Sequence, residues 1–146
     1  MINFGPAETY EVASLIFNEL KNVPENNVCF DWGKQYIPTI YSIIGAENPQ
    51  WASVSNAVFL CLNCAGTHRT LGAHYSSIRS LRLDSWNEKQ LKCMSVGGNK
   101  KFREFMSQYD LDQETIDYKY KTQAAEFYRK KVNLICFLIF SIFTNF

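Results

Sequence analysis

Two cysteines separated by two residues, Cys61 and Cys64, constrain the fold of this chain more than any other feature of its sequence. A tight turn directs both thiolates to one side, where they can bind a single metal ion. Arg69 follows on the segment that leaves this turn. A bound metal would hold that segment rigid, and a rigidly held guanidinium is suited to entering the phosphate site of another protein. The pattern therefore predicts a metal-supported arginine.

The size and composition of the chain favour one globular domain without a nucleic-acid partner. Its 146 residues match the size of one domain, and 47% of them are apolar. The formal net charge of +1 argues against a general attraction to nucleic acid or to anionic membranes. The N-terminal segment lacks the basic and apolar regions of a secretory signal. In such a chain, an odd number of irregularly spaced cysteines favours metal ligands and free thiols over disulfides. The cysteines are Cys29, Cys61, Cys64, Cys93 and Cys136.

The segment that contains the cysteine pair, CLNCAGTHRTLGAHYSSIRSLRLDSW at residues 61–86, resembles the signature of the Arf GTPase-activating protein family. Members of that family are zinc-finger domains that accelerate GTP hydrolysis on small ADP-ribosylation-factor GTPases. The resemblance implies an α+β, treble-clef-like domain over residues 1–131, with a short antiparallel sheet surrounded by helices. It continues through residues 26–31, 46–60, 97–106 and 118–131.

The zinc site implied by the resemblance consists of two C-x2-C knuckles that together supply four thiolates. Cys29, Cys61 and Cys64 match this pattern, but Trp32 occupies the position of the second cysteine, and residues 32–45 form an atypical insertion. Two explanations remain open: a genuine insertion with an altered or lost metal site, or a translated non-coding segment. The close matches on both sides favour the second. Candidates for the fourth ligand of the one structural zinc ion are Asp31, His68, His74, Cys93 and water.

The resemblance also implies roles for individual side chains and for partners. Arg69 is the arginine that enters the GTPase active site, and we expect Trp51, Arg79 and Asp84 to contact the partner. The partner would be an ADP-ribosylation factor in its GTP form, with coat proteins and the Golgi membrane surface as further partners. The resemblance implies a cytoplasmic location with recruitment to Golgi membranes.

Two alternatives remain open from the residues themselves. For the function, the alternative is a non-catalytic module that binds a GTPase or a coat component through a degenerate zinc site. For the metal site, the alternative is that the three matching cysteines are buried thiols in a fold without metal. For Arg69, the alternative role is an ordinary salt bridge at the surface.

Periodicity and turn signals predict the elements that surround the knuckle. A helix over residues 8–21 would bury a stripe formed by Val12, Leu15, Ile16 and Leu20. Ser85 and Glu88 have the spacing of a capping box for the helix that carries Leu91 and Met94. We expect strands over 57–60 and 76–84, a short helix over 65–72, a helix over 99–108, and a helix that carries Tyr120, Ala124, Phe127 and Tyr128 and ends at the basic cluster 129–131. The apolar tail, 132–146, favours non-coding read-through or a poorly packed helix over a membrane anchor.

Overall fold

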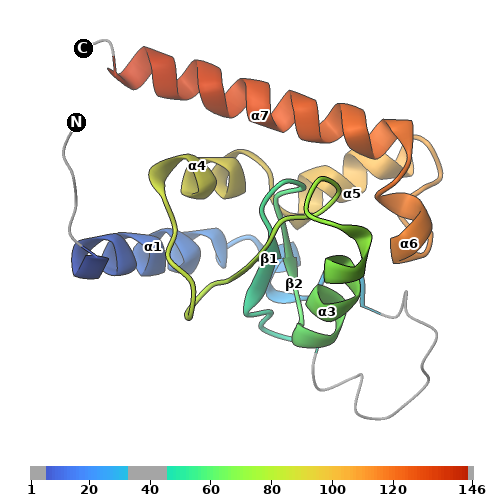
Figure 1. Ribbon diagram of the computed structural model, residues 1–146, viewed down its shortest axis with the longest axis horizontal. Helices are drawn as coiled ribbons and strands as arrows, with labels where there is room; N and C mark the ends of the chain where they lie inside the picture. Colours follow the sequence, from blue (N-terminus) through green and yellow to red (C-terminus); the bar gives the residue numbers. More distant parts are fainter. Residues whose placement is uncertain (1–5, 33–45, 145–146) are drawn as a thin grey trace.

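The computed structural model describes residues 6–32 and 46–144 (Figure 1). Except for Trp32, the predicted insertion lies outside the described residues. Helices surround a small antiparallel sheet, so the α+β prediction is confirmed. The elements are α1 (Pro6–Leu20), the 3-10 helix η1 (Pro24–Asn27), β1 (Trp51–Ser53), β2 (Val58–Leu60), α3 (Leu62–Leu71), β3 (Ile78–Ser80), α4 (Glu88–Val96), α5 (Asn99–Ser107), α6 (Ile116–Lys119) and α7 (Gln123–Thr144).

The sheet has the strand order β2-β1-β3, with both neighbours antiparallel to β1. Ala52 at the centre of β1 pairs with Phe59 on β2 and with Arg79 on β3. Because paired residues share a face of a sheet, Arg79 lies on the same face as the fully buried Phe59. The ring of Phe59 meets that of Phe17 edge-on, with centroids 6.4 Å apart, so this face is covered by α1. Helix α3 packs against β1 and β3.

The buried stripe of helix α1 matches the predicted one only in part: Ile16 and Leu20 are partly buried against the core, as predicted. Ala13 and Phe17 are buried, while Val12 and Leu15 are exposed. The ring of Phe17 packs edge-on against Trp86 at a centroid distance of 4.9 Å, in addition to its contact with Phe59. An aromatic side chain removes more apolar area from water than valine or leucine does, so Phe17 decides which face of the helix turns inward.

The cap predicted for α4 is wrong by two residues. Asn87, not Ser85, is the N-cap: its side chain accepts a hydrogen bond from the Gln90 amide at 2.8 Å, and the Gln90 side chain accepts one from the Asn87 amide at 3.0 Å. Helix α3 begins at Leu62, three residues earlier than predicted, and it ends before Gly72 as expected. The predicted strand over 76–84 is reduced to the short strand β3.

Helix α7 continues well beyond the basic cluster at which we expected it to end. It lies across α4 and α5, along the top of Figure 1, and buries Tyr128, Val132 and Cys136 against them. The predicted stripe is also wrong in part, because Tyr120 follows α6 and Phe127 is 60% exposed. Among the helices described, none is long and apolar enough to cross a membrane.

A buried asparagine fixes the segment that leads to Cys29. The side chain of Asn99 accepts a hydrogen bond from the Phe59 amide at 2.8 Å and donates to the carbonyl oxygens of Glu25 and Val28 at 2.9 and 2.8 Å. It therefore joins the start of α5 to β2 and to the ends of η1. The Cys29 amide donates to the carbonyl oxygen of Ala46 at 2.7 Å, and the Phe30 amide donates to that of Phe59 on β2 at 2.9 Å, so the Cys29 segment is held next to the sheet.

Candidate metal centre and surface arginine

Three cysteine sulfurs meet beside the start of α3. The Sγ atoms of Cys29, Cys61 and Cys64 all lie within 4.8 Å of one another, and all three side chains are buried. Cys29 comes from the segment after η1, Cys61 is the N-cap of α3, and Cys64 lies in its first turn. Sulfurs around a tetrahedral zinc ion lie about 4 Å apart, since each Zn–S bond is about 2.3 Å long. The three residues therefore fit a shared zinc ion.

The electrostatics of the cluster also fit a cation. The Cys64 amide donates to Sγ of Cys61 at 3.4 Å. Hydrogen bonds from the thiols of Cys29 and Cys64 lower the pKa of Cys61. The pKa of Cys29 is raised, first because of its hydrogen bond to Cys61. The cluster thus favours one thiolate and opposes ionisation of the others, which is the repulsion that a divalent cation would remove.

The fourth position is not filled by any of the side chains we predicted for it. Asp31, His68, His74 and Cys93 are all absent from the metal-compatible cluster found among residues 6–32 and 46–144. Trp32, at the position of the missing cysteine, offers only an indole N–H and no ligand atom. The described structure therefore does not place any of these four candidates with the three thiols. Water as the fourth ligand stays a prediction.

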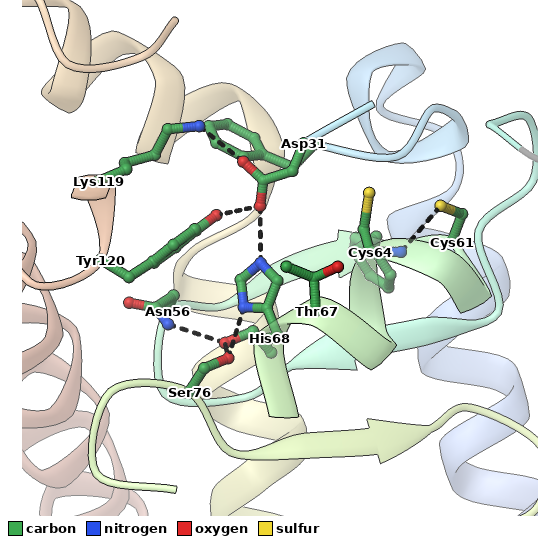
Figure 2. A network of polar contacts seen from close by, with 12 residues as sticks. Asp31, Asn56, Cys61, Cys64, Thr67, His68, Ser76, Lys119 and Tyr120 are labelled. Carbon is green, nitrogen blue, oxygen red and sulfur yellow. Dashed lines mark hydrogen bonds and ion pairs between the residues drawn. The ribbon is translucent and has the colours of Figure 1, made fainter. Parts of the chain in front are cut away.

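Asp31 and His68 instead belong to a buried polar network next to the thiols (Figure 2). Oδ2 of Asp31 accepts hydrogen bonds from Nε2 of His68 at 2.7 Å and from the hydroxyl of Tyr120 at 2.5 Å. Oδ1 of Asp31 accepts from Nζ of Lys119 at 2.6 Å. On the far side of the imidazole, Nδ1 of His68 lies 2.7 Å from Oγ of Ser76. The network joins the Cys29 segment, α3 and α6.

The Asp31 carboxylate is ionised in this network although it is fully buried. Burial would raise the pKa of Asp31, but the hydrogen bond from His68 and the charge of Lys119 outweigh it and lower the pKa to about 2. Burial, and next the Asp31 charge, raise the pKa of Tyr120 well above its ordinary value. Tyr120 therefore stays a neutral donor. A buried anion with three donors is stable only where all of them are held in place.

This network was not predicted from the sequence. Its signal was present in part, because Asp31 and His68 stand near the knuckle cysteines in the sequence, and we considered both only as candidates for the fourth metal ligand. Nothing in the sequence indicated that Lys119 is buried, because a lysine is almost never fully buried unless it is paired and its partner is not evident from the sequence. Here Lys119 is fully buried and lies 5.0 Å from the ring centroid of Phe30.

Arg69 follows directly after His68, but its side chain is exposed at the surface of α3. Its guanidinium lies 5.3 Å from the ring centroid of the partly exposed Trp51. The start of α3 carries two of the thiols, and His68 ties the last turn of α3 to Asp31. The backbone that presents Arg69 is therefore held at two points, while its guanidinium stays accessible.

The structure does not bring all the predicted partner-binding residues together. Trp51 lies beside Arg69, whereas Arg79 is on the other face of the sheet and donates to the carbonyl oxygen of Ser85 at 3.3 Å. Oδ2 of Asp84 accepts a hydrogen bond from the Ser80 amide at 2.7 Å and closes the turn after β3. The roles of Trp51, Arg79 and Asp84 toward a partner stay predictions.

The fold and the site define a class of small α+β domains built around a cysteine knuckle that also begins a helix. Residues 14–135 match a family described as "Putative GTPase activating protein for Arf". The chain therefore belongs to the ArfGap family.

Curated relatives are similar to this chain over most of its length. Identity is 44% over 121 residues with ADP-ribosylation factor GTPase-activating protein 3 of Bos taurus, covering 82% of this chain and 21% of the relative. It is 34% over 119 residues with ADP-ribosylation factor GTPase-activating protein GCS1 of Saccharomyces cerevisiae, covering 81% of this chain and 30% of the relative. The chain thus spans about a fifth of the mammalian relative's length.

Two solved structures have the same fold. The crystal structure titled as a putative GTPase activating protein for ADP ribosylation factor from Cryptosporidium parvum gives a TM-score of 0.63 at 32% identity, covering 87% of this chain and 90% of that chain. The ArfGap domain of HIV-1 Rev binding protein gives a TM-score of 0.56 at 16% identity and covers 86% of each chain. At that identity the second likeness supports the fold alone.

Proposed function

We propose that this domain activates GTP hydrolysis by an ADP-ribosylation-factor GTPase and that Arg69 enters the active site of that GTPase. The observation that carries the proposal is the placement of Arg69. Its guanidinium is exposed beside Trp51, on a helix anchored by two of the clustered thiols and by buried His68. The names of the relatives support the identity of the partner.

The chemistry requires one cation at the right position. Negative charge accumulates on the phosphate oxygens during phosphoryl transfer, and an arginine supplied in trans is worth about 10³–10⁵ in rate. The planar guanidinium donates two parallel hydrogen bonds, which an ammonium group cannot reproduce. Cys29, Cys61 and Cys64 would hold one zinc ion, which supplies a structural cross-link at the start of α3. The GTPase would supply the nucleotide, the magnesium ion and the attacking water.

The test is single-turnover GTP hydrolysis by an ADP-ribosylation factor, with wild-type domain and with Arg69→Lys. We expect Arg69→Lys to lose about 10³-fold or more of the acceleration, while the binding of the GTPase changes little. Arg82→Lys is the matched control because Arg82 is also an exposed arginine, in the turn after β3. Full acceleration by Arg69→Lys would remove this arginine from the mechanism.

A non-catalytic GTPase-binding or coat-binding module is the second candidate function. The observation that favours it is Trp32 at the position of a metal-binding cysteine, since a weakened knuckle would hold α3 less firmly. The same assay separates the two functions when it is combined with a binding measurement. If the wild-type domain binds the GTP-loaded GTPase but does not accelerate hydrolysis, it is a non-catalytic binding module.

The cellular setting that we propose follows the family resemblance. The domain would act in the cytoplasm and at Golgi membranes, with coat proteins as further partners. Trp51, Arg79 and Asp84 would contribute to the contact with the GTPase. Imaging of the tagged chain beside a Golgi marker tests the location, and a uniform distribution that no GTP-locked ADP-ribosylation factor alters would contradict it.

A further inference from the structure

A cavity of about 800 Å³ lies between α4, α7 and the loop that joins α3 to β3. Val54 and Ser55, just after β1, form part of its wall. Trp51, which contacts Arg69, is at the opposite end of the same strand. The cavity is therefore separate from the candidate GTPase-facing surface, and its size is within the range of small-ligand sites.

The charges that line the cavity are mostly positive. Lys89 comes from α4, Lys121 from the turn before α7, and Arg129 and Lys130 from α7. Glu126 is the one carboxylate among the lining residues, and it pairs with Lys130 at 2.9 Å. Within the part of the chain that the structure describes, Lys89, Lys121 and Arg129 do not form an ion pair with a carboxylate. Positive charge in a concave site concentrates the potential felt by an anion.

The arginine in this cavity is fixed before any ligand binds. Nη1 of Arg129 donates to Oδ1 of Asn56 at 3.1 Å and to the carbonyl oxygen of Tyr120 at 3.0 Å. Its guanidinium lies 5.8 Å from the ring centroid of Tyr75, and Nζ of Lys121 lies 6.0 Å from the same centroid. Tyr75 thus gathers two cations on one wall. Because Arg129 is already ordered, a phosphate group would meet donors that need little rearrangement.

We propose that this cavity binds a small, multiply phosphorylated anion. Several phosphates suit it better than one, because the cations come from three separate segments of the chain and surround a space larger than a single phosphate. The ligand is either a soluble polyphosphate or the headgroup of a lipid. Leu134, Phe137 and Leu138 are exposed on α7 beyond the cavity and would suit a lipid source. The site is independent of GTPase activation.

The direct test is calorimetric titration of the full chain with inositol 1,4,5-trisphosphate at low and at physiological salt. We expect salt-sensitive binding that falls at least tenfold in the Lys89→Glu/Lys121→Glu variant, because both exposed lysines line the cavity. The matched control is Arg82→Glu/Lys100→Glu, which makes the same charge change at exposed positions outside the cavity. It should retain binding to within about twofold.

A second measurement does not depend on how the variants fold. In the wild-type chain, the trisphosphate should shift the amide resonances of Ser55, Tyr75 and Gln90 at the cavity and leave that of Arg69 unchanged. Vesicles with and without phosphatidylinositol 4,5-bisphosphate then identify the source. If the vesicles that contain the lipid capture the wild-type chain but not Lys89→Glu/Lys121→Glu, the ligand is a lipid headgroup. If the chain binds the trisphosphate but not the vesicles, the ligand is soluble. Equal losses in both double variants, or no binding by wild type, would overturn the proposal.

Discussion

Asp31 and Lys119 show at the residue scale why the knuckle segment is fixed. Both side chains have no exposed surface, and each needs the other to be charged inside the protein. His68 and Tyr120 supply the remaining donors to the carboxylate. The neighbour of Arg69 in sequence is therefore part of a closed polar network, and the position of the arginine depends on residues far from the surface.

Replacing Lys119 by methionine should destabilise the domain by about 3–5 kcal/mol, because the Asp31 carboxylate would stay buried without its cation. Urea unfolding measures this loss. The double variant Asp31→Asn/Lys119→Met should recover a large part of it, since the uncompensated charge is then removed. Lys100→Met, at an exposed site on α5, should change the free energy of unfolding by less than about 0.5 kcal/mol. A Lys119→Met variant as stable as Lys100→Met would contradict the importance of this pair.

At the scale of single elements, sequence patterns predicted the location of most helices, but they did not predict correctly which face of a helix is buried or at which residue a helix begins or ends. Two overlapping capping patterns precede α4, and tertiary packing selects between them. Trp86 is buried against Phe17, and its Nε1 donates to the Ser80 carbonyl oxygen at 2.9 Å. That contact holds residue 86 outside the helix, so Asn87 caps it. The basic cluster in α7 could not end the helix, because Val132 and Cys136 beyond it are buried and no glycine or proline follows.

Lys21, directly after α1, gives the domain a pH dependence of known sign. Nζ of Lys21 donates to the carbonyl oxygens of Asn26 and Pro49 at 3.1 and 3.0 Å, and burial lowers its pKa from 10.5 to about 8. Between these two values the unfolded chain binds the proton more strongly than the folded chain. The contribution of Lys21 to the free energy of unfolding therefore rises with pH across this window and is constant below it.

Urea unfolding at several pH values from 7 to about 10.5 would measure this effect, with the window set by the pKa change of Lys21. Relative to wild type, Lys21→Gln should lack the rise, whereas Lys100→Gln should keep it. Other groups that titrate in this range contribute equally to all three proteins and cancel in the differences. Identical pH slopes in wild type and Lys21→Gln would show that burial does not perturb this amine.

At the scale of the whole molecule, local spacing indicated Cys61 and Cys64, because knuckle spacing is a local property of the chain, and the family resemblance added Cys29 and the treble-clef-like form of the α+β fold. The fourth ligand and the buried network are not local. Asp31 and Lys119 are 88 residues apart, and no spacing rule joins them. Arg79 and Trp51 were grouped by resemblance, but the register of the sheet places them on opposite faces.

Metal removal tests how far the domain depends on its knuckle. Part of the core, including Phe102 and Met106 on α5, lies on elements that carry none of the three clustered thiols. We therefore expect chelation of zinc, or Cys61→Ser, to reduce GTPase acceleration at least tenfold while the far-UV circular dichroism changes little. Cys136→Ser, on α7 and outside the thiol cluster, is the control. Purified protein without bound zinc but with full activity would contradict this expectation.

The Asp31 network also has a consequence for synthesis on the ribosome. Asp31 finds its partners in α3 and in residues 119 and 120, so its charge stays unsatisfied until most of the chain has left the exit tunnel. A nascent chain that already contains all three clustered cysteines still lacks the lysine and tyrosine that complete their surroundings. The knuckle cysteines are therefore translated before the residues that complete the neighbouring polar network.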